Sequence, residues 1–143
     1  MWQDLSSFLS GIGPDMNVMD SSGNTTAMLS AAAGGSVQVE WGFTGGAVAL
    51  LGSIQFNAIL YADPIGPAGT ISVDSSIVAP VTPIPTSGPV SYQATITIPP
   101  NTLLADAVYV FTVIITAFEV TAAGSVQLPI AGFAEGPLIA VTA

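Results

Sequence analysis

Residues 107–120 read AVYVFTVIITAFEV, and this stretch decides which class of fold the chain can adopt. A strand with one face in water alternates apolar and polar residues. This stretch is apolar at nearly every position, so both of its faces need to be covered. We therefore expect a strand that places one face in the core of a domain and packs its second apolar face against something else.

Several other segments show the alternation of apolar and polar residues that is typical of strands. They are residues 36–43, 53–62, 70–79 and 90–98. Within the second of them, Ile59 and Tyr61 make the outward face apolar as well. The last segment, residues 125–143, is interrupted by Pro129 and by residues 132–137, which favours an edge strand with a bulge.

About seven strands at even spacing, with turn signals between them, predict an all-β fold and specifically an antiparallel β-sandwich. A closed barrel is the alternative, but a Pro-rich connection at residues 79–89 and an interrupted last strand fit open sheets better. A sandwich buries only one face of each sheet, so the second apolar face of residues 107–120 must meet an N-terminal arm, a partner or another copy. The residues expected to face the core on the two cleanest strands are Val37, Val39, Trp41 and Phe43, and Val90, Tyr92, Ala94, Ile96 and Ile98.

The N-terminus places apolar residues at helical spacing, which predicts an amphipathic helix of two to three turns over residues 2–12. Gly11, Gly13 and Pro14 would end this helix, and the turn-rich residues 15–26 would follow it as a linker. So short a helix needs a surface to pack on, either its own domain or a neighbouring subunit. We therefore expect an arm and linker at residues 1–24 and a sandwich domain at residues 25–143.

The stretch LLADAVYVF at residues 103–111 resembles the corner before the next-to-last strand of bacterial immunoglobulin-like and fibronectin III-like domains. The resemblance implies an Ig-like sandwich in which Tyr109 bonds back across the corner and Phe111 holds a core position. Leu104 and Asp106 would complete the structural corner. Such domains mostly serve as adhesive, structural or scaffold modules, so the resemblance implies a function of that kind.

The chain carries nine Asp and Glu residues and no Lys, Arg or His, which gives a formal net charge of −9. Without a basic surface to neutralise phosphates, nucleic acid is excluded as a partner, and so is electrostatic binding to anionic lipid. Cys is also absent, which excludes disulfides, thiolate catalysis and Cys-ligated zinc.

No catalytic or cofactor-binding arrangement emerges from the motifs. Ser and Thr hydroxyls would need an activating base, and no His, Lys or Cys is present to supply it. Oxygen donors at Asp15, Asn17, Asp20 and Asn24 could suggest calcium, but the EF-hand spacing is not met and an Asx-turn linker explains the same residues. We therefore expect a protein that is not an enzyme and has no cofactor and no metal site.

Hydropathy and the N-terminal sequence indicate where in or outside the cell the protein is located. No run reaches about 18 consecutive apolar residues, so we expect no insertion into a membrane. The start, MWQDLSSFLSGIGP, has neither a basic region nor a continuous apolar region of a standard signal peptide. The lack of Lys and Arg leaves trypsin-like proteases no cleavage site, which favours an extracellular or cell-surface location, with the cytoplasm as the alternative.

Two functions of different classes fit these features. The first is a self-assembling structural subunit of an extracellular filament, sheath or surface layer, a homo-oligomer or polymer whose copies meet through apolar sheet faces and the arm. The second is a monomeric or dimeric module that binds a protein or glycan through its loops. The candidate subunit-interface residues are Trp2, Leu5, Phe8, Leu9, Ile12, Ile59, Tyr61, Val113 and Ile115.

Overall fold

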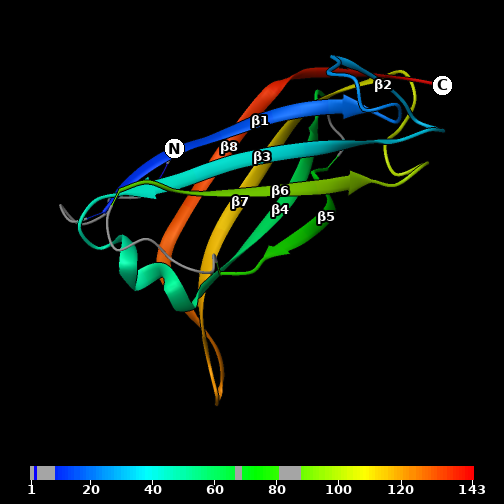
Figure 1. Cartoon of the computed structure of the whole chain (residues 1–143). Coiled ribbons are helices and arrows are strands. Elements are labelled where there is room, and N and C mark those ends of the chain that lie inside the picture. The colour runs from blue at the N-terminus through cyan, green and yellow to red at the C-terminus, as the bar shows by residue number, and fades with distance from the viewer. Residues whose placement is uncertain (1, 3–8, 67–68, 81–87) are drawn as a thin grey trace.

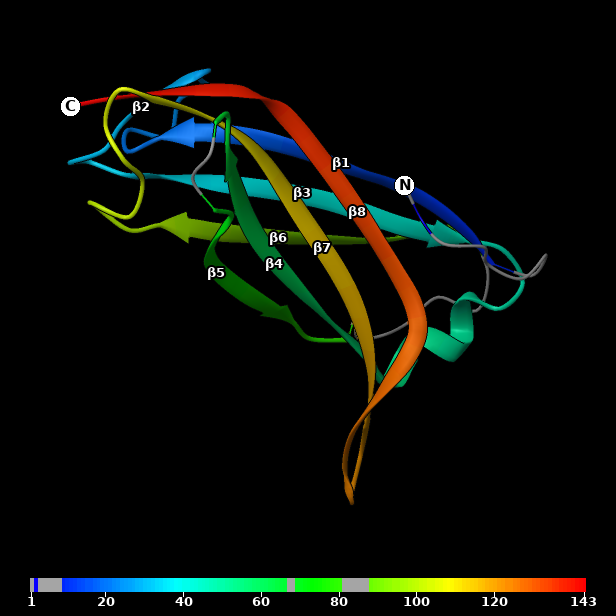
Figure 2. The same ribbon diagram turned by 180° about the vertical axis from the view of Figure 1, so that it is seen from behind.

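The computed structural model describes residues 2, 9–66, 69–80 and 88–143, and these residues form an all-β structure. Within them, eight strands make two sheets that pack face to face, so the prediction of a mostly antiparallel β-sandwich is confirmed (Figures 1 and 2). The sheet orders are β1–β3–β6 and β2–β8–β7–β4–β5, with β2 and β8 parallel. The strands are β1 (Ser10–Asp20), β2 (Met28–Ser30), β3 (Gly35–Thr44), β4 (Ile54–Pro64), β5 (Ile71–Val78), β6 (Val90–Ile98), β7 (Ala107–Thr121) and β8 (Gly124–Thr142).

The core lies between the two sheets and consists of the inward residues of each strand. The residues predicted to face inward on β3 and β6 are all buried, and the strands carry polar residues on their outward faces. On β7 the odd-numbered residues from Tyr109 to Ala117 are fully buried. Full burial of one such large apolar side chain stabilises the fold by about 1.5–3 kcal/mol, so this layer dominates the stability.

The last strand, β8, is continuous despite its prolines. Its pairing with β7 shifts register twice, between Val110 and Thr112 and between Thr116 and Ala117 on the β7 side. The residues skipped on β8 include Pro129 and Pro137, because proline has no N–H to give to the ladder. The predicted bulge therefore occurs, and a second accompanies it. The prediction of an edge strand is wrong at the end of β8, because β2 pairs with β8 at Ala140–Thr142.

The predicted N-terminal helix is wrong at its described residues 9–12, and the predicted linker is wrong at residues 15–20, whereas residues 21–24 form a turn. Ser10–Asp20 is strand β1, which pairs with β3 along most of its length. Ile12 is 47% exposed on this strand, whereas the helical stripe required it to be covered. The strand is favoured for two reasons. Gly11, Gly13 and Pro14 are poor helix formers, and the extended segment, paired with β3, buries Val18. The predicted helical residues 3–8, Leu5 and Phe8 among them, lie outside the described residues.

Two smaller elements complete the fold. A short 3-10 helix, η1 (Val48–Ser53), connects β3 to β4. The hairpin between β7 and β8 turns at Thr121 and Gly124, and it extends past the rest of both sheets (Figures 1 and 2). Among the described residues, no helix is long and apolar enough to cross a membrane.

Candidate functional site

The outer face of the five-stranded sheet is apolar at its centre. Because the odd-numbered residues of β7 point into the core, its even-numbered residues point outward. The strand register places Ile59 of β4 opposite Ile114 of β7, and Ile114 opposite Phe133 of β8. Ile114 is 37% exposed and Phe133 is 44% exposed, so this row of three side chains forms an apolar surface across three strands. We call this row and its immediate neighbours the outer apolar face.

The surroundings of this row are mostly uncharged. Thr112 and Thr116 flank Ile114 on the same face of β7, and Asn57 lies opposite Thr116. Further apolar side chains extend the face to both sides, because Ile77 on β5 is 67% exposed and Leu138 on β8 is 58% exposed. Exposed contiguous apolar patches are uncommon on monomers and mark interaction surfaces.

Trp2 fills the gap between the two sheets where β1 and β8 approach each other. It forms an isolated antiparallel bridge with Gly132, and its ring packs on Phe43 with the ring centroids 4.8 Å apart. A methyl group at Gly11 or at Gly132 would overlap the indole ring, so both glycines are needed for this position. The Trp2 indole N–H also donates a hydrogen bond to the carbonyl oxygen of Ile12 at 3.4 Å.

A hollow of about 540 Å³ lies beside Trp2 on the outer apolar face. Its lining is mostly apolar, and Glu135 is the one carboxylate among its residues. Trp2 therefore borders the same surface as the row on β4, β7 and β8. The other residues that line the hollow are Thr112, Ile114, Ala131, Gly132 and Phe133.

Some of the candidate interface residues lie on the outer face of the five-stranded sheet, and others are buried in the core. Ile59 and Tyr61 lie on the outer face, half-buried. Val113 and Ile115 are wrong as interface residues, because both are fully buried in the core between the sheets. Leu9 is buried as well and joins that core.

Sequence reasoning missed the two residues at the centre of the surface, Ile114 and Phe133. Counting outward from Tyr109 as an inward residue would have placed Ile114 on the outer face. Phe133 could not be found in this way, because the two bulges on β8 change which of its residues share a face with Ile114.

The corner before β7 has the geometry that the Ig-like resemblance implies. The Tyr109 hydroxyl oxygen accepts a hydrogen bond from the backbone N–H of Leu104 at 3.0 Å. Asp106 has a positive φ of 60°, which Asp adopts more readily than most residues, and its backbone N–H donates to the carbonyl oxygen of Val141. Phe111 is fully buried two residues after Tyr109. This corner fixes which residues of β7 face inward.

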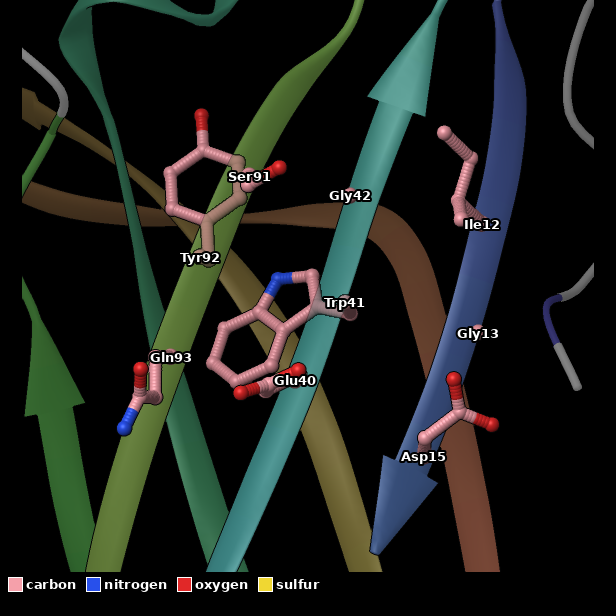
Figure 3. Close-up of a pocket in the computed structure, with 9 residues that line it drawn as sticks. All are labelled: Ile12, Gly13, Asp15, Glu40, Trp41, Gly42, Ser91, Tyr92 and Gln93. Carbon is pink, nitrogen blue, oxygen red and sulfur yellow. The ribbon is translucent and has the colours of Figure 1, made fainter.

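A second hollow, of about 390 Å³, lies over the three-stranded sheet between β1, β3 and β6 (Figure 3). Asp15 and Glu40 are opposite each other across β1 and β3, so two like charges meet there without a cation in the sequence to offset them. No group of three or more Asp, Glu, His or Cys side chains in the described part of the chain is arranged to hold a metal ion. The hollow therefore contains two carboxylates, and the described residues around it do not form a set of ligands for a metal ion.

The candidate calcium donors are used locally instead. The Asp20 carboxylate accepts hydrogen bonds from the backbone N–H groups of Ser22 and Asn24, at 2.9 and 3.0 Å. This is the Asx-turn alternative, in which the side chain stabilises the turn after β1. Asp15 and Asn17 lie on β1 itself.

Trp41 and Tyr92 stack side by side in the core, with ring centroids 5.8 Å apart. The Tyr92 hydroxyl is buried, and among the described residues it has no hydrogen-bond partner. Burial raises the pKa of Tyr92 to about 12, because the charged phenolate would be poorly solvated there. Because this hydroxyl has no described hydrogen-bond partner, no hydrogen bond compensates for the hydration that it loses on folding.

Replacing Tyr92 with phenylalanine is expected to raise the free energy of unfolding by about 1 kcal/mol at neutral pH. Wild-type stability should be unaffected by Tyr92 titration below the unfolded pKa of about 10 and should then fall as the pH rises toward the folded pKa of about 12. Denaturant unfolding of both proteins between pH 8 and pH 12 measures this difference. Parallel pH profiles for the two proteins would contradict the assignment.

Comparisons with known proteins support the fold and no more. No protein-family model and no curated protein sequence matches the chain. Among solved structures, it resembles the solution structure of AT1g01470 from Arabidopsis thaliana, with 10% identity over 90% of this chain and 81% of the other, at a TM-score of 0.51. Weaker similarity extends to AggA, the major subunit of aggregative adherence fimbriae type I from Escherichia coli, with 8% identity, 98% and 99% coverage and a TM-score of 0.46. The first similarity is compatible with the β-sandwich that the structure shows, and the comparisons assign the chain to no family.

Proposed function

We propose that this chain is a non-enzymatic structural protein whose copies associate through the outer apolar face, as subunits of an extracellular filament, sheath or surface layer. The observation that carries the proposal is the row Ile59–Ile114–Phe133, which crosses three strands and stays partly exposed at Ile114 and Phe133. When two such faces pack on each other, their side chains interdigitate as in the core of a sandwich.

The net charge of −9 makes copies of the chain repel each other, so a contact between two copies requires a surface with few charges, whereas a partner chosen by electrostatics would be basic and would bind where the carboxylates gather. The outer apolar face has few charges at its centre, because Thr112, Thr116 and Asn57 are uncharged and Glu135, opposite Thr112, is the one carboxylate beside the row. Depletion of charge is also typical of the core of an interface.

Trp2 extends the proposed contact toward the N-terminus. Its side chain borders the hollow that Ile114 and Phe133 also line, so Trp2 and the sheet present one continuous, mostly apolar surface. This arrangement supports the expectation that the N-terminal segment takes part in the subunit contact.

Association of like-charged copies is expected to strengthen with ionic strength. Raising NaCl from about 20 mM to about 500 mM shortens the Debye length from about 20 Å to about 4 Å and screens the repulsion between copies. Sedimentation velocity of the full chain should therefore show larger species at high salt, and negative-stain micrographs of the same samples should show regular polymers. A basic partner would give the opposite dependence, with weaker binding at high salt.

The alternative function, a monomeric or dimeric binding module, predicts a different result in the same experiment. Such a module would sediment as a single species, either one chain of 14.3 kDa or a pair of such chains, at every salt concentration. That outcome would overturn the proposed assembly into a filament, sheath or surface layer.

A further inference from the structure

β6 forms one edge of the three-stranded sheet, close to β5 of the other sheet, and its own residues carry no proline, charge or bulge that would protect such an edge. Its nine residues pair with β3 in an unbroken register, and among the described residues it pairs with no other strand. It contains no proline, no charge and no bulge. Its outward side chains, which are Ser91, Gln93, Thr95 and Thr97, are exposed and neutral.

The other sheet edges in the described part of the chain are protected. β1 contains Pro14 and a register shift between Ile12 and Asp15. β5 carries Asp74, and its residue Val73 is skipped at a register shift in the pairing with β4. β8 has prolines and two bulges, and the β2 strand that covers its end is three residues long. Protected edges of this kind resist pairing with another chain, whereas a long regular neutral edge favours it.

We propose that β6 pairs antiparallel with β6 of a second copy, so that two three-stranded sheets join into one sheet of six strands. This inference rests on the proposed function and adds a second contact to it. The two-fold axis passes through Ala94, because this residue is the centre of Val90–Ile98 and only this register pairs the strand over its whole length. Gln93 then lies opposite Thr95 of the second copy, and Ser91 opposite Thr97.

The electrostatics of this pairing are favourable for a second copy. No charged residue lies on β6, and the nearest carboxylate along the sheet is Glu40, which is opposite Gln93 on β3. The joined sheet would separate the β3 strands of the two copies by three strand spacings, or about 14 Å. This distance exceeds the Debye length of about 8 Å at physiological ionic strength, so the two Glu40 side chains repel each other little.

A second contact of this kind explains how association could continue beyond a dimer. A two-fold contact through the outer apolar face alone closes at two copies, and so does a two-fold contact through β6 alone. The two surfaces lie on different sheets of the sandwich, so one copy can use both at once. Alternation of the two contacts then produces an open chain of subunits.

Charge substitutions at the edge test the proposal. Thr95→Glu places a carboxylate on the exposed side of β6, and the full chain carrying it is expected to stop at a dimer held by the outer apolar face. The matched control is Gln38→Glu, since Gln38 is opposite Thr95 on β3 and carries the same added charge one strand away from the edge. The control should polymerise like the wild type. Wild-type polymers from Thr95→Glu would overturn the β6 pairing and leave the proposed function intact.

Cysteine cross-linking tests the register directly, because the chain has no cysteine of its own. A mixture of Gln93→Cys and Thr95→Cys chains should form a disulfide-linked dimer under mild oxidation, since directly opposite residues on antiparallel strands lie about 4.5–5.5 Å apart at Cα. Either variant alone should cross-link at least ten times less, because its two cysteines would be diagonal. Equal cross-linking in all three samples would contradict the register centred on Ala94.

Discussion

Replacing Ile114 with glutamate is expected to leave the sandwich folded and to remove association through the outer apolar face. Ile114 is partly exposed, so the new carboxylate stays hydrated in the free chain. In the contact it would be desolvated without a partner, since the sequence contains no Lys, Arg or His. An uncompensated buried charge costs about 3 kcal/mol or more, so the association constant should fall at least about 100-fold.

The control for this variant is Leu50→Glu, which adds the same charge at an exposed leucine of η1, outside both sheets. Sedimentation velocity at a concentration where the wild type associates separates the two. If Leu50→Glu and Ile114→Glu reduce association equally, net charge rather than the outer apolar face controls it, and the assigned surface is wrong.

Val113→Glu, one residue away, is expected to prevent folding. Val113 is fully buried between the sheets, opposite Leu60 of β4 and Ala134 of β8, and no cationic side chain exists to pair with a carboxylate. A buried unpaired charge costs several kcal/mol even when it takes up a proton instead, and a domain is stable by only about 5–15 kcal/mol in total.

Circular dichroism and thermal unfolding of Val113→Glu and Ile114→Glu, prepared side by side, measure this contrast. The first should lack a cooperative transition, and the second should melt within a few degrees of the wild type. Val113→Ala keeps the position testable if the glutamate variant is insoluble, with an expected loss of about 2 kcal/mol from the cavity. A stable Val113→Glu protein would mean that the two faces of β7 are assigned the wrong way round.

The sequence predicted most of the sheet structure because alternation is a local signal. Residues 36–43 and 90–98 carry it without interruption, and their inward side chains are the buried ones in the structure. Residues 107–120 are apolar on both faces, so periodicity alone could not separate the core residue Val113 from the surface residue Ile114. The corner at Tyr109 removes this ambiguity, because its hydrogen bond to Leu104 fixes the direction of one side chain.

The prediction of an N-terminal helix failed because it used only the spacing of nearby residues. The conformation of this segment depends instead on its pairing with a distant strand. Trp2, Leu9 and Ile12 fit a helical stripe, yet β1 is extended because it pairs with β3, which starts 25 residues after β1 starts. The position of β6 at the edge of its sheet also depends on residues that are distant in the sequence. Its sequence shows a clean strand, but only the sheet order β1–β3–β6 makes it an edge.

Copies of this chain are expected to associate with each other in solution. Light scattering measures the mass of the full chain in solution, from micromolar to millimolar concentration, without assuming which surface is used. We predict a weight-average mass above 14.3 kDa that rises with concentration. A constant mass of 14.3 kDa over the whole range would contradict the account.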